Sequence, residues 1–577
     1  MEQFPFYEVF PMSTNMPSIT AIARGSIAAL GLLSIPVHAQ LTPEWISTLP
    51  VGGSLSSGIG GYVVDDAGIA YLTGTTVSGF GPFGLDVVTA AIGPNGSLLW
   101  QTTYDGPENG FDQASAIALG PDGALYVSGD TQGPDFYANV LLLKYDSATG
   151  ALLDSVVWST GPTTSEYGGS VAVDALGGVY VVGGTGGDGT DALILKFSAA
   201  GELQWKRTWD GAAVEPYSLD SALRVLIDPN GDVIVLIHGV TGSNQPDFVV
   251  VKYAPATGAT IWTASWGDNG GDTPRDMELD AAGDIYIAGT SGFFETAAFS
   301  IVRLRNTDGA VLWYAYDTFA NHASTRALTL DGQGGVYVTG TVDPDTDESN
   351  ENDNIYTFKR STDGALLWTH LYGGSAKWQR DEPSDVVADP AGHVFVGGYT
   401  NSPPYVADTI TLVLDAQSGV EVDRHIIPGG PGLTAQSGFM AFDADFNLLN
   451  GATTLDYDTG GAWISLVKFT TLASTPYQLA LPQFDAGSVA TLAVKHATPL
   501  QTQFLGYSVI GTAAIPFPVL DVTLGLANPF LLVYGAADGA GSYSVDIPVP
   551  AGIGGLTVWF QAVQMSGATP VVKRTIQ

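Results

Sequence analysis

The chain has 577 residues, a formal net charge of -38, 73 glycines and no cysteine. Hydrophobic residues make up 45% of it, so it can bury a large core and is not a disordered polyelectrolyte. Because only 20 basic residues stand against 58 acidic ones, nucleic acids and anionic membrane surfaces are not expected partners. The lack of cysteine excludes disulfides, thiolate metal sites and cysteine nucleophiles.

Residues 1–39 are predicted to be an N-terminal extension followed by a secretory signal peptide. Arg24 supplies a positive charge, residues 25–35 form an apolar run, and Val37-His38-Ala39 fits a cleavage site of small residues. The apolar run is too short to span a bilayer, and no later run reaches about 18 apolar residues. We therefore expect an exported protein without a transmembrane segment, secreted or on the cell surface, with the periplasm as the alternative.

One sequence pattern recurs through residues 40–470. It reads Asp-x-x-Gly-x-(Ala/Val/Ile)-Tyr-(Val/Ile/Leu)-x-Gly-x-Thr, with clear copies at 65–76, 174–185 and 331–341 and a degenerate copy at 443–453. Its second glycine is assigned to positions 74, 129, 184, 239, 289, 340, 398 and 451, a period of about 54 residues. Such a period indicates a repeat architecture.

Each repeat is predicted to contain four short strands, of which the fourth usually carries a tryptophan such as Trp100 or Trp205. Four strands in each repeat of this length are typical of a β-propeller blade. The last repeat lacks a tryptophan strand, and residues 43–49, which resemble 99–103, are predicted to complete it. We predict an all-β protein with eight blades; seven is the alternative, because the eighth copy is degenerate.

The pattern, with Asp191-Ala192-Leu193-Ile194-Leu195-Lys196 and Tyr372-Gly373-Gly374-Ser375, resembles the bacterial β-propeller repeat called SBBP. That resemblance covers about three quarters of the chain and implies an exported bacterial protein, in a family whose function is mostly unassigned. Residues 257–262 (Thr-Gly-Ala-Thr-Ile-Trp) are similar to the tryptophan-docking repeats of eight-bladed quinoprotein dehydrogenases. These repeats are scaffold, so the second resemblance implies architecture and no chemistry.

Residues 471–577 are predicted to form a separate module. Alternating runs such as 489–494, 530–534 and 556–562 are punctuated by proline and glycine. This predicts a small C-terminal β-sandwich. We weigh two roles for it, surface display and a stabilising cap for the propeller.

Basic residues divide into those that follow the repeat and those that do not. Six occupy one repeat position and are expected to belong to the scaffold: Lys144, Lys196, Lys252, Arg303, Lys359 and Lys468. An Asp or Asn precedes this position by five residues in five blades, and is expected to anchor neighbouring blades: Asp86, Asn139, Asp191, Asp247 and Asn354.

Arg275 and Arg326 depart from the repeat, each five residues before a turn aspartate. This places both at the mouth of the central channel, on the face whose loops vary most in length. Guanidinium groups beside acidic and aromatic side chains can hold an anionic or sugar-like ligand. The predicted ligand site adds four loop residues to these arginines: His322, Trp378, Arg380 and Asp381. The alternative is that the arginines form local ion pairs.

A weaker prediction concerns calcium. Asp343, Asp345 and Asp347 imitate the start of a calcium loop, but Glu348 stands where the turn needs glycine, and Asn354 where a bidentate acid is expected. A solvated acidic loop is the alternative, and no other cofactor is expected.

The sequence shows no catalytic constellation. It favours an exported, non-enzymatic scaffold that binds a protein or glycan through the variable face. The alternatives are a quinoprotein-like dehydrogenase, a polysaccharide-cleaving propeller and a structural cell-surface component. The sequence leaves the oligomeric state open.

Overall fold

The computed structural model describes residues 41–470 except 51–58, 78–83, 187–189, 212–219, 242–244, 268–269, 293–296, 320–321, 344–352, 374–379, 403–405, 429–432 and 457–461, together with ten strands of the C-terminal module. The predicted signal peptide lies outside the described residues. The chain divides into two compact units, one of which contains residues 39–471. Among the described residues there is no helix of the length and hydropathy needed to cross a bilayer.

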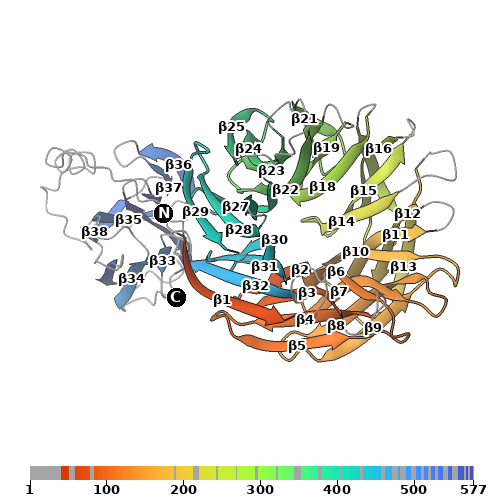
Figure 1. The fold of residues 1–577 in the computed structure, drawn as a ribbon. Helices are drawn as coiled ribbons and strands as arrows, with labels where there is room; N and C mark the ends of the chain where they lie inside the picture. The colour runs from red at the N-terminus through yellow and green to blue at the C-terminus, as the bar shows by residue number, and fades with distance from the viewer. Residues whose placement is uncertain are drawn as a thin grey trace, which may run out of the picture. The chain divides into compact units, whose positions relative to one another are not determined.

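The larger unit is an eight-bladed β-propeller (Figure 1). The strands of blades one to four are β2 (Ile59–Val64), β3 (Ala70–Val77), β4 (Leu85–Ile92), β5 (Leu98–Tyr104); β6 (Asp112–Leu119), β7 (Ala124–Gln132), β8 (Ala138–Asp146), β9 (Leu152–Trp158); β10 (Glu166–Val173), β11 (Val179–Gly186), β12 (Thr190–Phe197), β13 (Leu203–Trp209); and β14 (Ser221–Ile227), β15 (Val233–Thr241), β16 (Gln245–Tyr253), β17 (Thr260–Trp266).

The strands of blades five to eight are β18 (Asp272–Leu279), β19 (Ile285–Ser291), β20 (Ala298–Leu304), β21 (Val311–Thr318); β22 (Ala323–Leu330), β23 (Gly335–Val342), β24 (Asn354–Ser361), β25 (Leu366–Tyr372); β26 (Asp381–Ala388), β27 (His393–Ser402), β28 (Val406–Asp415), β29 (Glu421–Ile427); and β30 (Leu433–Phe442), β31 (Leu448–Asp456), β32 (Ala462–Thr470) with β1 (Thr42–Pro50). The first strands of neighbouring blades contact one another all round the ring, including β30 with β2.

The prediction that the N-terminal segment completes the last blade is confirmed. Strand β1 pairs antiparallel with β32, and Figure 1 shows the two side by side. The indole of Trp45 on β1 donates a hydrogen bond to the Pro94 carbonyl at 2.8 Å, as Trp205 does to Pro255 at 3.0 Å. Eight blades are therefore present, and the alternative of seven is wrong.

The described strands of the C-terminal module form sheets of their own. One sheet contains β33 (Gln478–Ala480), β34 (Val489–Lys495) and β39 (Tyr543–Pro548), and a pair is formed by β36 (Thr512–Phe517) and β37 (Val522–Leu526). A five-stranded sheet contains β35 (Thr502–Ser508), β38 (Phe530–Ala536), β40 (Thr557–Gln564), β41 (Gly567–Ala568) and β42 (Val572–Thr575).

The repeat aspartates shape the turn between the first two strands. Oδ1 of Asp65 accepts the backbone N–H of Ala67 at 2.9 Å and that of Ile69 at 2.8 Å, while Gly68 takes a φ of 76°. Glycine adopts this left-handed conformation without steric cost. Most acids of the repeat are thus used locally, as backbone hydrogen-bond acceptors.

The repeated cation ties each turn to the next blade, as its periodicity predicts. Nζ of Lys252 lies 2.7 Å from Oδ2 of the turn residue Asp228 and 2.9 Å from Oδ1 of Asn306 in blade five. Lys196 similarly donates to the Pro255 carbonyl of the following blade at 2.9 Å. These cations belong to the scaffold.

The first strand of every blade carries a β-bulge, which leaves one residue without a partner on the second strand. The bulged residues are Gly60, Ser115, Gly169, Leu223, Arg275, Arg326, Ser384 and Gly438. A bulge turns its side chain away from the direction that regular pleating would give it.

The register around the bulge corrects three of the predicted repeat glycines. The repeat glycine of the second strand pairs with the first-strand residue that precedes the bulge. In blades three, four and eight this paired residue is Gly183, Ile237 and Ala452, whereas the sequence pattern assigned Gly184, Gly239 and Gly451. In most blades this residue is glycine, because a Cβ would overlap the first strand's backbone, as at Gly129 against Gln113.

Charged side chains of the first strands also meet inside the ring. Nη2 of Arg224 on β14 lies 2.5 Å from Oδ1 of Asp276 on β18. Asp385 on β26 accepts the backbone N–H of Met440 on β30 at 2.7 Å. Burial raises the pKa of Asp385 to about 7 and, with the charge of Asp276, that of Glu278 to about 8.

Ring closure predicts unequal effects at two positions of β1. Leu49 is 2% exposed in the core between the first and last blades, and Ile46 is 54% exposed on the same strand. Leu49→Ala should destabilise the propeller by about 3 kcal/mol through lost burial and the cavity left behind. Ile46→Ala is the matched control and should change the melting temperature little. Calorimetry that gives equal melting temperatures for both variants would contradict a closing role for β1.

The raised pKa of Asp385 predicts a stability that falls with pH. The folded protein keeps this carboxyl protonated up to about pH 7, whereas an unfolded aspartate loses its proton near pH 4. The stabilisation is complete below about pH 4 and is lost as pH rises through 7. Asp385→Asn should reduce the fall in the free energy of unfolding between pH 5 and pH 8 by an amount on the order of 2 kcal/mol, which a smaller fall in melting temperature would reveal. Asp66→Asn, at an exposed turn, should keep the wild-type difference; equal pH profiles for all three proteins would contradict this prediction.

Candidate functional site

Arg275 and Arg326 occupy the bulges of two adjacent blades, five and six. Burial, together with the positive charge of Arg326, lowers the pKa of Arg275. The side chain of Arg275 makes no hydrogen bond or ion pair with any other described residue. The two arginines therefore lie near one another, and Arg275 has no acidic partner within the described part of the chain.

Arg326 has one such partner. Its Nη2 lies 3.0 Å from Oε2 of Glu382 at the start of blade seven, while its Nε is buried and unpaired. Burial, and then the hydrogen bond to Glu382, raise the pKa of Tyr399. Local ion pairing, the alternative, is therefore present at Arg326, and at Arg275 none is found with the residues that the structure describes.

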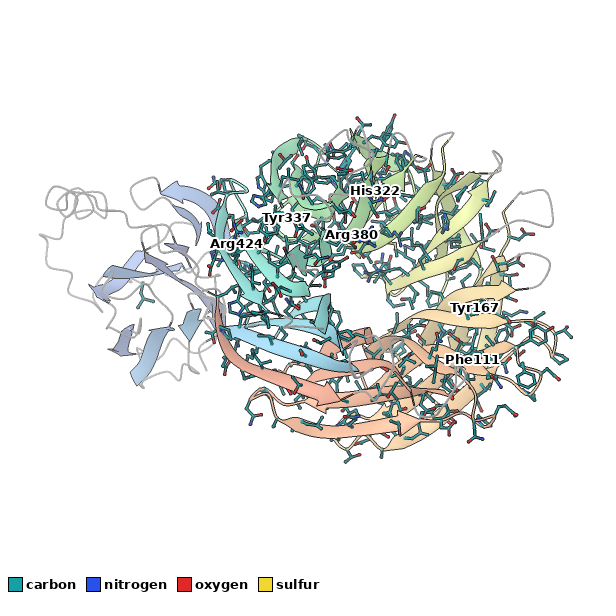
Figure 2. All side chains as sticks on the ribbon, viewed as in Figure 1. Phe111, Tyr167, His322, Tyr337, Arg380 and Arg424 are labelled. Atoms are coloured by element: carbon teal, nitrogen blue, oxygen red, sulfur yellow. The ribbon has the colours of Figure 1, made fainter. Side chains whose placement is uncertain are left out.

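The other predicted residues form a second group beside the arginines. Nδ1 of His322 lies 3.5 Å from Oδ1 of Asp353, and Nε of Arg380 lies 4.0 Å from Oδ2 of the same carboxylate. Figure 2 shows His322 and Arg380 in the same region of the ring. The hydrogen bond to Asp353 raises the pKa of His322, which favours its charged form. The backbone N–H of Asp381 donates to the Asp353 carbonyl at 2.7 Å, and the side chain of Asp381 is buried.

The arginine pair and the His322 group are close enough for their charges to influence one another. The charges of Arg326 and Glu382 both act on His322, and the charges of Arg380 and Arg326 both act on Tyr399. Side chains from blades five, six and seven therefore share one region of the propeller. It contains three guanidinium groups in a protein whose net charge is -38.

Sequence reasoning missed His238 on β15, which adjoins Arg275. Burial, helped by the positive charge of Arg275, lowers the pKa of His238, so the imidazole is neutral. Its Nε2 is buried and has no hydrogen-bond partner. The signal was present in the irregular fourth repeat, where Ile237 replaces the usual glycine immediately before this histidine.

Several predicted residues are not placed. Trp378, Asp345 and Asp347 lie outside the described residues. The backbone N–H of Asp343 donates to the His322 carbonyl at 3.0 Å, so the start of the acidic loop adjoins the His322 group. The calcium prediction for this loop stays a prediction.

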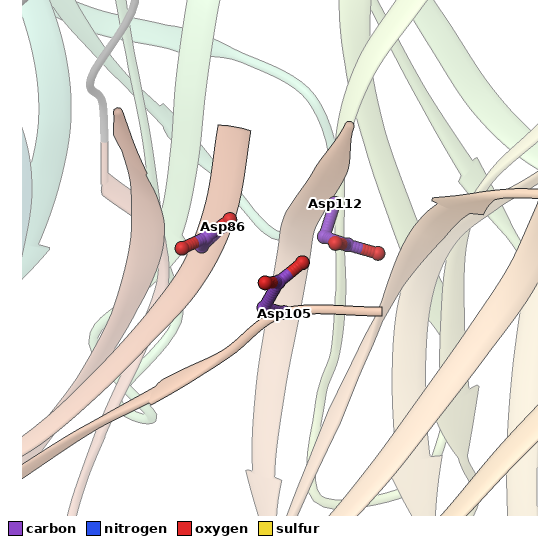
Figure 3. A group of neighbouring side chains, drawn as sticks. All are labelled: Asp86, Asp105 and Asp112. Atoms are coloured by element: carbon purple, nitrogen blue, oxygen red, sulfur yellow. The ribbon is translucent and has the colours of Figure 1, made fainter. Parts of the chain in front are cut away.

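A different carboxylate group lies where blades one and two meet. Oxygens of Asp86, Asp105 and Asp112 all lie within 4.8 Å of one another (Figure 3). Burial, with the charges of Asp105 and Asp86, raises the pKa of Asp112, which accepts the N–H of Gly106 at 2.7 Å. Carboxylate oxygens in this arrangement are of the kind that bind Ca²⁺.

The same junction recurs between blades four and five, which indicates a structural role. A Cβ at Gly267 would overlap the carboxylates of both Asp247 and Asp272. Asp86 and Asp247 are the repeat acids that were expected to anchor neighbouring blades, and both lie against the first strand of the next blade. The group in Figure 3 therefore belongs to the blade junctions.

Comparison with known proteins finds distant structural likenesses and no family. No protein-family model and no curated sequence matches the chain. Similar solved structures include quinohemoprotein alcohol dehydrogenase from Comamonas testosteroni (14% identity, 77% of this chain and 79% of that chain, TM-score 0.47) and the quinohemoprotein alcohol dehydrogenase ADHIIG from Pseudomonas putida HK5 (13%, 78% and 79%, 0.46). The polysaccharide lyase Uly1 is also similar (10%, 75% and 99%, 0.42). These likenesses are to propeller proteins of different activities, and the function must be argued from the side chains.

Proposed function

We propose that this protein is an exported, non-enzymatic binding scaffold of the cell envelope or extracellular space. Its ligand is a protein or glycan that presents an anionic group to Arg275 and Arg326 at the mouth of the channel. The predicted signal peptide and the resemblance to SBBP repeats support export and a bacterial source.

The observation that carries this proposal is the state of Arg275. In a chain with 58 acidic residues, this guanidinium group has no acidic partner among the described residues and lies beside another arginine. Two neighbouring positive charges repel each other, and partial burial strengthens the repulsion. A bound anion would relieve it and supply the missing acceptor.

The geometry suits an anion with several oxygens. A guanidinium group binds carboxylate, sulfate or phosphate through paired, charge-assisted hydrogen bonds. The bulges fix the backbone from which both arginines project, so less conformational entropy is lost on binding. Arg380, 48% exposed, adds a third positive group at the rim.

One observation favours a second candidate, the cleavage of an acidic polysaccharide. The neutral imidazole of His238 lies beside Arg275 and has a free Nε2. A neutral imidazole can accept a proton from a carbon next to a carboxylate whose charge the arginines neutralise. Release of unsaturated ends from polygalacturonate, lost in His238→Gln, would support this candidate over the binding scaffold.

The binding proposal predicts the effect of Arg275→Gln. Titration calorimetry with polygalacturonate and with dextran sulfate should show binding to the wild type that weakens as sodium chloride is raised. Arg275→Gln should weaken binding by about tenfold, the loss expected for one charge-assisted pair of hydrogen bonds.

Arg305→Gln is the matched control, because Arg305 is exposed, pairs with Asp308 and lies in a turn on the opposite face. It removes the same charge and should leave the affinity unchanged. Equal affinities for the wild type and Arg275→Gln, or equal losses in Arg275→Gln and Arg305→Gln, would contradict the site.

A further inference from the structure

Three aromatic rings form a patch on the outer strands of blades four and five. The ring centroids of Trp266 on β17 and Tyr316 on β21 are 5.1 Å apart, with 29° between the ring planes. The centroid of Tyr314 lies 5.6 Å from that of Trp266 and 5.9 Å from that of Tyr316. Tyr314 is 59% exposed although it belongs to a regular strand. We call Trp266, Tyr314 and Tyr316 the aromatic platform.

The platform breaks the repeat. The residue after the fourth-strand tryptophan is exposed and polar in other blades: Gln101, Lys206, Thr263 and Thr369. In blade five the residue at this position is Tyr314, the only aromatic residue in this comparison of five blades. Two residues further along the fourth strand, blade five has Tyr316, whereas the same four blades have Thr103, Thr208, Ser265 and Leu371. Both tyrosines thus stand at outward-facing positions that the scaffold fills without an aromatic ring.

Blade three shows how the scaffold covers the equivalent ring without a tyrosine. Lys206 has the same strand position as Tyr314, and its Nζ lies 5.6 Å from the ring centre of Trp158, the counterpart of Trp266 in blade two. A lysine is therefore sufficient to cover the tryptophan. The tyrosine in blade five adds an exposed aromatic face that packing of the blades does not require.

The two strands that carry the platform hold little charge. Strand β17 has no acidic or basic side chain, and the one acid on β21, Asp317, is paired with Arg360, whose Nη2 lies 2.5 and 2.6 Å from the two carboxylate oxygens. On β21 the exposed residue Thr318 lies on the same side of the strand as Tyr314 and Tyr316, so its hydroxyl group borders the tyrosines. On a protein of charge -38, such a surface suits a ligand without charge that offers both flat apolar faces and hydroxyl groups.

We propose that the aromatic platform binds neutral polysaccharide. The C–H face of a pyranose ring can lie on the exposed face of Tyr314, while its hydroxyl groups bond to the phenolic hydroxyl of Tyr314 and to Thr318. Contacts among the three rings hold Tyr314 in place before binding, which lowers the entropy lost. The platform lies on outer strands and Arg275 lies on an innermost strand, so this inference is independent of the proposed anion site.

The test is affinity gel electrophoresis of the full-length protein with hydroxyethyl cellulose or galactomannan in the gel. The wild type should be retarded by at least one of these polymers. Tyr314→Lys reproduces the blade-three arrangement, keeps a cover on Trp266, and should weaken the binding by at least fivefold. Lys206→Tyr creates a second platform over Trp158 and should increase the retardation.

Two controls make the result specific. Tyr167→Thr removes an exposed tyrosine side chain (47% exposed) from strand β10 of blade three and should leave the retardation unchanged. Arg275→Gln should also leave it unchanged, so that failure of the anion site and failure of the platform are separate results.

The inference is overturned if neither polymer retards the wild type, or if Tyr314→Lys and Tyr167→Thr behave alike. It is also overturned if only charged polymers or protein partners respond to Tyr314→Lys, since the platform would then serve a different class of ligand.

Discussion

Closure of the ring is the constraint on which the rest of the propeller depends. Most blades pack an outer tryptophan, a repeated cation or both against a turn of the next blade, so the last blade needs a strand from the other end of the chain. Strand β1 supplies that strand, and Trp45 docks on blade one as Trp205 docks on blade four. With the ring closed, the first strands are held around one channel, and side chains far apart in the chain become neighbours.

The repeated blade turn, rather than a requirement for a cationic partner, explains the high negative charge of the protein. The turn aspartates accept backbone N–H groups, as Asp65 does, and a repeated lysine such as Lys252 binds the turn aspartate of its own blade. The acids are therefore a consequence of using one Asp-rich turn in every blade. Against this background the informative residues are cations and rings outside the pattern, namely Arg275, Arg326 and Tyr314.

The bulge gives the two arginines their significance. In a regular strand a side chain would alternate between the faces of the blade, whereas a bulged residue has no partner on the second strand and can be re-aimed. Most other blades place glycine or serine there, such as Gly60 or Ser384, and blade four places Leu223. Because adjacent bulges lie at the same level of the channel, the arginines of blades five and six approach each other, although their positions in the chain are about 50 residues apart.

Much of the fold was determined by the sequence, because a propeller blade is a local unit. The Asp-x-x-Gly turn, the alternating strands and the tryptophan position predicted eight blades and the closing strand. They also separated repeated cations such as Lys252 from Arg275. Local pattern failed where the repeat is irregular: Gly239 was assigned to the place that Ile237 occupies, and so the role of His238 was missed. The tertiary structure alone decided which groups meet between blades, that Glu382 pairs with Arg326 and not Arg275, and that Tyr314 lies over Trp266. These outcomes depend on pairings between blades, which a pattern within one blade does not contain.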